Sequence, residues 1–363
     1  MTTSPPELPF LSGLFPEEIA ERYQLRPYQG RQIFQWIHRK GASSFEKMTN
    51  LPKELRERLS KETLFPATKV SKIQGSSASG TRKALLLLAD NECIESVLIP
   101  DRNRYTVCVS SQVGCPLKCA FCATGLSGYR RNLNAAEIVE QVVHLRAAGE
   151  LPESAVCNIV YMGMGEPFYN YDEVRKSIRI LMHPEGLGTG ARHITVSTAG
   201  DVKGIERFAA EEWQVRLSVS LHAAQEEKRS QLVPLNRKFG LQRLHAALRE
   251  YNQHTGRKFT LEWTLLDGVN DTEDDARDLV RFTRGLDASV NLIPWNPVAG
   301  LPYRPSPPAA CEAFQAQLTR SGVRATLRRE KGRDIDAACG QLRRSENGDG
   351  VPPEPSDIGR GEA

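Results

Sequence analysis

From about residue 156 to residue 327, strand-like and helix-like segments alternate along this chain of 363 residues. Short apolar runs typical of buried strands are each followed by a longer segment with apolar residues at helical spacing. About six such units in succession predict an α/β fold with a parallel sheet, either doubly wound or curled toward a barrel. Reactive side chains are then expected just after the carboxyl ends of the strands. The expected strands are 156–162, 193–197, 215–221, 259–265, 289–293 and 324–327, and the expected helices are 135–147, 172–181, 202–210, 241–252, 273–285 and 309–321.

A basic segment precedes this alternation. Between Arg22 and Lys72 there are twelve Lys or Arg and four Asp or Glu, a net +8, although the whole chain is only +4. Helical patterns at 27–39 and 51–61 predict a small basic helical module, whose charges either form a solvated surface or bind a polyanion such as nucleic acid. Three further strand-like runs, at 84–89, 92–99 and 104–111, follow it. We therefore expect a basic helical, RNA-binding module at 1–80, a core with an N-terminal strand extension at 81–342, and a disordered tail at 343–363.

The composition indicates an ordinary globular chain, with 40% hydrophobic and 25% charged residues. No apolar run approaches the roughly 18 residues that a membrane span needs. The first basic residue is Arg22, so no export signal is expected, and eight cysteines in such a chain favour a reducing, cytoplasmic location. In that compartment cysteines pack, bind metal or react.

The cysteines Cys115, Cys119 and Cys122 have a CxxxCxxC spacing in the string GCPLKCAFC. Three thiolates from one short loop suit an iron–sulfur cluster, and with three rather than four protein ligands one iron stays open. A structural zinc needs a fourth ligand and usually paired CxxC spacing. Zinc and plain packed cysteines therefore remain the less favoured alternatives.

The motif resembles that of the radical S-adenosylmethionine (SAM) superfamily, which has an aromatic residue before the last cysteine, here Phe121. That resemblance implies a [4Fe-4S] cluster whose open iron binds the amino and carboxylate groups of SAM, which is then cleaved to a deoxyadenosyl radical. It also implies an incomplete (β/α)6 barrel. The string GMGEP at 163–167, at the end of a predicted strand, is similar to a glycine-rich motif of the same superfamily.

A longer set of strings resembles the RlmN/Cfr family of RNA adenine methyltransferases. The strings occur in order from about residue 23 to residue 342: IESVLIP, CPLKCAFCATG, GMGEP, VSTAG, SLHA, WNP and DIDAACGQL. On this resemblance Cys115, Cys119 and Cys122 hold the cluster. Gly165, Glu166, Ser197, Ser220, Leu221, His222 and Asn296 bind SAM. Cys339 is methylated, Cys108 is its resolving partner and Glu95 is a proton acceptor.

The residues themselves allow plainer interpretations. Taken alone, Cys108 is expected to be a thiol packed in the core, and Glu95 a charged side chain that faces solvent. The polar residues at the strand ends, taken alone, are expected to cap helices or form turns. An acid in an apolar strand can also have a raised pKa. Cys93, Cys157 and Cys311 carry no motif and are expected in the core.

The family resemblance implies the substrates and the partners. The substrates are an adenosine in the peptidyl-transferase region of 23S rRNA and the adenosine beside the anticodon of certain tRNAs, methylated at C2. The route uses two SAM molecules, a methylated Cys339, and a transient disulfide between Cys108 and Cys339.

The electron donor is expected to be a flavodoxin or ferredoxin, no membrane is involved, and the chain is expected to be a monomer. Methylation at C8 of the same rRNA adenosine, and from another class a zinc-stabilised RNA-binding module, are the alternatives. Phosphate contacts are expected from basic residues at 22–72, 130–131 and 324–333.

Overall fold

The computed structural model describes residues 10–101, 104–328 and 331–342. At its centre is a ten-stranded sheet in the order β1-β2-β3-β4-β7-β8-β9-β10-β11-β12. Neighbours from β1 to β4 are antiparallel, whereas all pairs from β4 to β12 are parallel. The strands are β1 (Thr68–Gly75), β2 (Arg82–Leu88), β3 (Cys93–Asp101), β4 (Arg104–Cys108), β7 (Cys157–Tyr161), β8 (Ile194–Thr198), β9 (Arg216–Ser220), β10 (Phe259–Leu265), β11 (Ala288–Pro294) and β12 (Ala325–Leu327), and a separate hairpin contains β5 (Gln112–Gly114) and β6 (Tyr129–Asn132).

Helices connect the parallel strands and confirm the predicted alternation. Each strand from β4 to β11 in the parallel part is followed by at least one helix, which gives six strand–helix units before β12. The sheet stays open, because β1 and β12 stand at its two ends, as expected for an incomplete barrel. The helices are α1 (Pro16–Arg22), α2 (Pro27–His38), α3 (Lys53–Glu62), α4 (Ala123–Leu126), α5 (Ala135–Ala148), α6 (Tyr171–Met182), α7 (Val202–Ala209), α8 (Glu226–Leu232), α9 (Asn236–Thr255), α10 (Glu273–Thr283) and α11 (Pro308–Arg320).

Local sequence explains where these helices begin. Thr272 accepts a hydrogen bond from Asp275 N at 3.2 Å, and Asp275 accepts one from Thr272 N in return, so the first turn of α10 is capped at both positions. Asn134 and Glu137 make the same reciprocal pair at the start of α5. Behind these caps the apolar faces of the helices pack on the sheet, whose parallel strands are largely buried.

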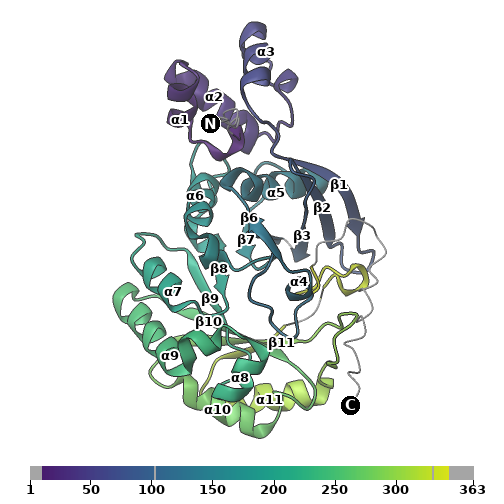
Figure 1. The fold of residues 1–363 in the computed structure, drawn as a ribbon, viewed down its shortest axis with the longest axis vertical. Helices are drawn as coiled ribbons and strands as arrows, with labels where there is room; N and C mark the ends of the chain where they lie inside the picture. Colours follow the sequence, from purple (N-terminus) through teal and green to yellow (C-terminus); the bar gives the residue numbers. More distant parts are fainter. Residues whose placement is uncertain (1–9, 102–103, 329–330, 343–363) are drawn as a thin grey trace, which may run out of the picture.

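The N-terminal helices α1 to α3 gather at one end of the molecule, next to α5 and α6, whereas α7 to α11 lie around the other end (Figure 1). A buried carboxylate joins the N-terminal module to the core. Glu140 in α5 accepts hydrogen bonds from Ser12 Oγ at 2.5 Å and from the backbone amides of Ala67 and Thr68, both at 2.8 Å. Because these four groups are buried together, the module is docked on the core through a specific polar contact.

Strand β1 is the main element that the sequence prediction missed. It lies inside the segment expected to be helical, yet it pairs antiparallel with β2 at the edge of the sheet. Val70 and Ile73, its apolar residues, are three positions apart, and the pairing register shifts between Val70 and Lys72. An exposed edge strand with lysines and an irregular register shows no two-residue alternation, so the pattern was hidden.

Within the part of the chain that the structure describes, no helix is both long and apolar enough to cross a membrane. The tail predicted at 343–363 lies outside the described residues.

Candidate active site

The three predicted cluster cysteines lie on one loop, residues 115–122, which follows β5. Gly114 ends that strand with φ +76°, and a Cβ there would lie 1.7 Å from the carbonyl oxygen of Gly128. Only glycine fits this position. Cys115 N then donates to Gly128 O at 3.0 Å, and Ala120 N donates to Leu232 O at 3.0 Å. The three-cysteine loop is therefore fixed mainly by its backbone.

The side chains of Cys115, Cys119 and Cys122 all line one cavity of about 160 Å³. Burial raises the pKa of Cys115 to about 12 and that of Cys119 well above its usual value, and the neighbouring cysteines and Glu166 act in the same direction. The thiolates of Cys115 and Cys119 would repel each other, so these partly buried thiols need a strong positive partner to lose their protons. The donor set therefore suits a positively charged iron–sulfur cluster.

The spacing of these sulfurs also bears on the kind of metal centre. Among the described residues, no group of three or more His, Cys, Asp or Glu is arranged around a position for a single metal ion. The three cysteines that bind a cluster each hold a different iron, so their sulfurs need not converge on one point. The arrangement is compatible with a cluster and gives no support to a single zinc.

Gly165 and Glu166 line the same cavity as the three cysteines. Gly165 has φ +107°, and a Cβ there would lie 2.7 Å from Gln112 Cβ. The carboxylate of Glu166 accepts Ala199 N at 2.8 Å and Phe168 N at 3.2 Å. Burial raises the pKa of Glu166 to about 7, against the lowering effect of these hydrogen bonds. The carboxyl group is thus held rigidly and faces a site in which a cationic group would stabilise its charge.

His222, Ser220 and Ser197 line the same cavity at the ends of neighbouring strands. His222 Nδ1 accepts a hydrogen bond from Thr264 N at 3.0 Å, so the neutral ring carries its proton on Nε2. Burial lowers the pKa of His222 to about 3. The ring also stands edge-on to Phe121, with the centroids 4.6 Å apart. Phe121 therefore connects the three-cysteine loop to this strand end.

Leu221 and Asn296 lie differently from the other predicted SAM residues. The side chain of Leu221 is buried, and its carbonyl oxygen accepts Arg229 Nε at 3.1 Å. Asn296 lines a second, larger cavity, and its Nδ2 donates to Cys339 O at 3.4 Å. The structure thus brings five of the seven predicted residues into the smaller cavity and places Asn296 at its neighbour.

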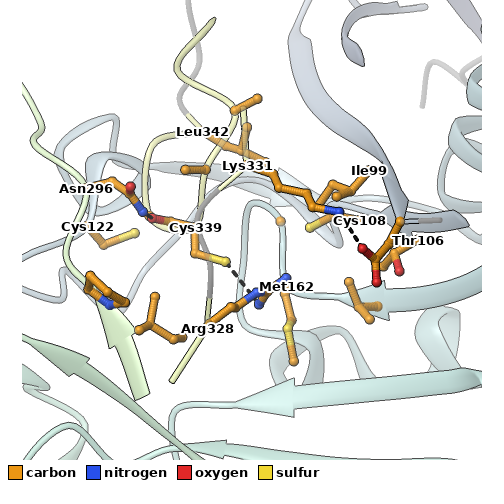
Figure 2. Close-up of a pocket in the computed structure, with 18 of the residues that line it drawn as sticks. Ile99, Thr106, Cys108, Cys122, Met162, Asn296, Arg328, Lys331, Cys339 and Leu342 are labelled. Carbon is orange, nitrogen blue, oxygen red and sulfur yellow. Dashed lines mark hydrogen bonds and ion pairs between the residues drawn. The ribbon is translucent and has the colours of Figure 1, made fainter. Parts of the chain in front are cut away.

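The larger cavity, of about 440 Å³, contains the other two predicted reactive cysteines. Cys108 enters it from the carboxyl end of β4, and Cys339 enters from residues 331–342, named here the Cys339 loop (Figure 2). Cys339 and Cys122 line both cavities. Burial raises the pKa of Cys108 to about 12. Cys339 therefore borders both the cavity of the three-cysteine loop and the cavity of Cys108.

Side chains hold the Cys339 loop over the sheet. Lys331 Nζ lies 2.7 Å from Asp101 Oδ1 and donates to Pro100 O, also at 2.7 Å. Thr124 Oγ1 donates to Leu342 O at 2.6 Å, and Gln341 Nε2 donates to Pro297 O at 3.0 Å. The contacts of Lys331 and Leu342 join residues more than 200 positions apart in the sequence, whereas the contact of Gln341 is with a nearer segment.

Glu95 is buried rather than solvent-facing, and its partner is Lys83. The two charged groups are 2.9 Å apart, and Lys83 Nζ also donates to Asp336 O in the Cys339 loop at 3.4 Å. The plainer interpretation of Glu95 as a solvent-facing charge is therefore wrong. Val97 stands opposite Cys108 in the β3–β4 register, so Glu95, two residues earlier, is on the sheet face that carries Cys108. Glu95 does not line the larger cavity itself.

The remaining cysteines are buried, as expected. Cys93, Cys157 and Cys311 have at most 6% of their surface exposed. The sequence prediction gave Lys83 and Glu262 no role at the site, and it included Arg328 only in the range 324–333 of expected phosphate contacts. Arg328 follows the last strand, so the rule that reactive groups follow strand ends would have found it. Among the expected phosphate contacts, Arg131 is instead paired with Asp90 at 2.6 Å and with Glu137 at 2.8 Å.

Comparison with known proteins identifies the class. The family model described as "Radical SAM superfamily" matches residues 109–282, and the model described as "Ribosomal RNA large subunit methyltransferase N-terminal domain" matches residues 17–64. The fold and the three-cysteine site are thus those of a radical SAM enzyme. A probable dual-specificity RNA methyltransferase RlmN from Heliobacterium modesticaldum is 47% identical over 93% of this chain and 90% of its own. The corresponding protein of Moorella thermoacetica is 48% identical over 92% of this chain and 96% of its own. The chain belongs to the RlmN family of radical SAM RNA methyltransferases.

A solved structure agrees with this assignment. The crystal structure of a radical SAM methyltransferase from Sphaerobacter thermophilus is 44% identical, with a TM-score of 0.89 over 92% of this chain and 98% of that one. Membership of the superfamily implies a [4Fe-4S] cluster and SAM, and the cysteine donor set described above fits the cluster. The alternative of a non-catalytic zinc module is wrong, because the family consists of methyltransferases.

Proposed function

We propose that this enzyme methylates C2 of an adenosine in the peptidyl-transferase region of 23S rRNA and of the adenosine beside the anticodon in tRNAs. The observation that carries the proposal is the position of Cys339, which lines both the cavity of the three cysteines and the cavity of Cys108. A group attached to that sulfur can be reached from both sides. The relatives' name, dual-specificity RNA methyltransferase, supports two RNA substrates.

Cys115, Cys119 and Cys122 would hold the [4Fe-4S] cluster, and Gly165, Glu166, Ser197, Ser220, Leu221, His222 and Asn296 would hold SAM. Bound together, the cluster and SAM supply one-electron chemistry, which an electron-poor aromatic carbon such as adenine C2 requires. The buried carboxyl group of Glu166 would meet the ammonium group of SAM. His222, with its proton fixed on Nε2, offers a hydrogen-bond donor to the same cavity.

In the proposed route Cys339 carries the methyl group, and Cys108 releases the product. Cys339 first takes a methyl group on its sulfur by displacement, which is covalent catalysis. The methyl group would lose one hydrogen atom to the one-electron chemistry that bound SAM supplies, and its carbon would then bond to adenine C2. With loss of the C2 proton and one electron, the RNA would be attached to Cys339 through a methylene group. Attack of the Cys108 sulfur on the Cys339 sulfur forms a disulfide, breaks the bond between sulfur and carbon, and frees the methylated RNA. The disulfide must be reduced after each turnover, which fits a cytoplasmic enzyme.

Glu95 is the proposed acceptor of the C2 proton. It lies on the face of the sheet that carries Cys108, and Lys83 connects it to the Cys339 loop. Its carboxylate must come within hydrogen-bond distance of the base when RNA is bound. E95Q should therefore stop RNA methylation while leaving methylation of Cys339 intact.

RNA binding is assigned to the basic N-terminal module and to exposed basic residues near the site. An adenine must leave its stack to reach a buried sulfur, so an unpaired or splayed nucleotide is the proposed substrate form. A flavodoxin or ferredoxin is the proposed electron donor, and the enzyme is proposed to act as a monomer.

An anaerobic assay with rRNA fragments, tRNA and labelled SAM tests the proposal. C339A should abolish RNA methylation while SAM cleavage and cluster content persist, and the matched variant C311A should retain all three activities. C108A should accumulate a covalent protein–RNA adduct. Retained methylation in C339A, or no adduct in C108A, contradicts the route. Mass spectrometry of the product nucleosides distinguishes C2 from the alternative C8 methylation.

A further inference from the structure

Arg328 is a basic residue that contacts the sulfur of Cys339, the atom proposed to carry the methyl group. It follows β12, and its backbone amide donates to Leu292 O in β11 at 2.8 Å, which fixes the start of the side chain. The guanidinium points into the larger cavity, where Nη1 donates to Cys339 Sγ at 3.6 Å (Figure 2). This is an ordinary distance for a hydrogen bond to sulfur, which is larger than oxygen.

The charges around Arg328 leave its cation facing the two sulfurs. Lys331, the other cation lining the described part of the cavity, is paired with Asp101 at 2.7 Å. Arg328 makes no ion pair within 4.0 Å among the residues that the structure describes. Cys339 above all, then Glu262 and Cys108, raise the pKa of Arg328. Glu262 is itself held by Ser218 Oγ and Asn291 Nδ2, both at 2.6 Å, so the carboxylate behind the guanidinium is fixed.

We propose that Arg328 is a further catalytic residue, which stabilises the thiolate of Cys339 for methyl uptake and afterwards the thiolate of Cys108 for resolution. This rests on the proposed function. The thiolate, not the thiol, is the nucleophile in both steps, and a charged N–H donor stabilises it by a charge-assisted hydrogen bond.

The first step balances as a displacement. The Cys339 thiol gives its proton to solvent, and the thiolate supplies the electron pair for the new bond between sulfur and methyl carbon. The bond between that carbon and the sulfonium sulfur of SAM breaks, and its electron pair remains on the departing sulfur as neutral S-adenosylhomocysteine. The negative charge on Cys339 disappears in this step.

The second use of Arg328 follows from that loss of charge. A methylated Cys339 sulfur is neutral and accepts hydrogen bonds only weakly. The guanidinium is then available to Cys108, whose pKa burial raises to about 12 while Arg328 acts to lower it. In resolution the Cys108 thiolate supplies the electron pair of the disulfide bond, and the pair of the broken bond between Cys339 sulfur and carbon goes to the methylene carbon, which takes up a proton.

The first test measures thiol reactivity in the cluster-loaded enzyme without SAM. Iodoacetamide alkylation of the unmethylated fraction of Cys339 is followed by mass spectrometry of its peptide. R328M should react about 10- to 100-fold more slowly than wild type, the loss expected for one charge-assisted hydrogen bond. R328K should recover part of the rate, and R320M, at the exposed end of α11, should match wild type. Equal rates in R328M and wild type overturn the proposal.

The second test measures methyl uptake with SAM but without a reductant. Formation of S-adenosylhomocysteine and methyl-Cys339 should slow in R328M and R328Q by a similar factor, with the Kd for SAM and the cluster content unchanged. R328Q keeps hydrogen-bonding capacity without charge, so it replaces R328M if that variant fails to fold. A weaker Kd for RNA with unchanged thiol reactivity would make Arg328 a phosphate contact and overturn the proposal. Absence of methyl-Cys339 in wild type would contradict the proposed function instead.

Discussion

The three-cysteine loop and the Cys339 loop border the same cavities, but different kinds of contact hold them. Backbone hydrogen bonds and a glycine without room for a Cβ fix the three-cysteine loop. The Cys339 loop is held mostly by side-chain hydrogen bonds, from its own Lys331 and Gln341 and from Thr124, beside one backbone hydrogen bond from Ala123 N to Gly340 O at 2.8 Å. A rigid backbone cradle suits ligands that must keep one geometry. A loop held by a few exchangeable side-chain contacts can shift at smaller cost, which suits a residue that serves two cavities in turn.

Loss of a cluster ligand should give the largest effect and act only on the rigid side of this comparison. C119S should lose bound iron and SAM cleavage, and RNA methylation should fall at least a thousandfold, because a hydroxyl does not replace a thiolate on iron. Iron analysis and deoxyadenosine release measure this. The control C157A removes another buried cysteine and should keep its iron. Full iron content in C119S would remove that residue from the ligand set.

G165A should be nearly as severe, because its Cβ would clash with Gln112 and push the cavity-lining backbone out of place. The new Cβ would lie 2.7 Å from Gln112 Cβ, at a φ of +107° that L-residues avoid. We expect SAM affinity to fall by about 100-fold or more while iron content survives, as measured by isothermal titration. G285A has a similar φ of +76° but no atom within 4 Å of its Cβ, so it separates backbone strain from the clash. Equal SAM affinity in both variants would show that Gly165 does not shape the SAM site.

The same difference explains what the sequence could predict. The three-cysteine loop is a contiguous motif, so its residues and its chemistry were readable, and the alternation of strands and helices placed Glu166, Ser197 and Ser220 at strand ends. The partners of the Cys339 loop were harder to predict, because Lys83 is an ordinary charged residue in sequence and Arg328 is marked only by its place after the last strand. Their roles arise only when the sheet brings β2, β3 and β12 beneath residues 331–342. Strand β1 was missed for the related reason that an exposed edge leaves little hydrophobic pattern.

A fall in pH should lower the free energy of unfolding through His222, whose ring contacts Phe121 of the three-cysteine loop. In the unfolded chain an imidazole takes up a proton near pH 6.5, whereas burial lowers the pKa of His222 in the fold to about 3. Between these values the unfolded state binds more protons, so stability is fully present above pH 6.5 and is lost as the pH falls. At pH 5 this group alone should lower the free energy of unfolding by about 2 kcal/mol.

Urea unfolding of the cluster-free protein at pH 7.5 and pH 5 measures this loss. His38, whose pKa burial also lowers to about 3, should contribute in the same direction from the N-terminal module. H222Q and H38Q should therefore each lose less stability on acidification than wild type. An unchanged pH dependence in H222Q would mean that this ring is protonated in the fold.

The smallest expected effect concerns an anchor of the Cys339 loop. T124V removes the hydrogen bond from Thr124 Oγ1 to Leu342 O and should cost about 1 kcal/mol locally. Because the loop then opens more often, hydrogen exchange at 331–342 should rise about fivefold and RNA methylation should fall a few fold, with iron content and SAM affinity unchanged. T283V, which removes a similar hydrogen bond within α10, should leave exchange in the Cys339 loop as in wild type. If T124V instead lowered iron content, the two loops would form one rigid unit, and the distinction between a fixed cradle and a movable carrier would fail.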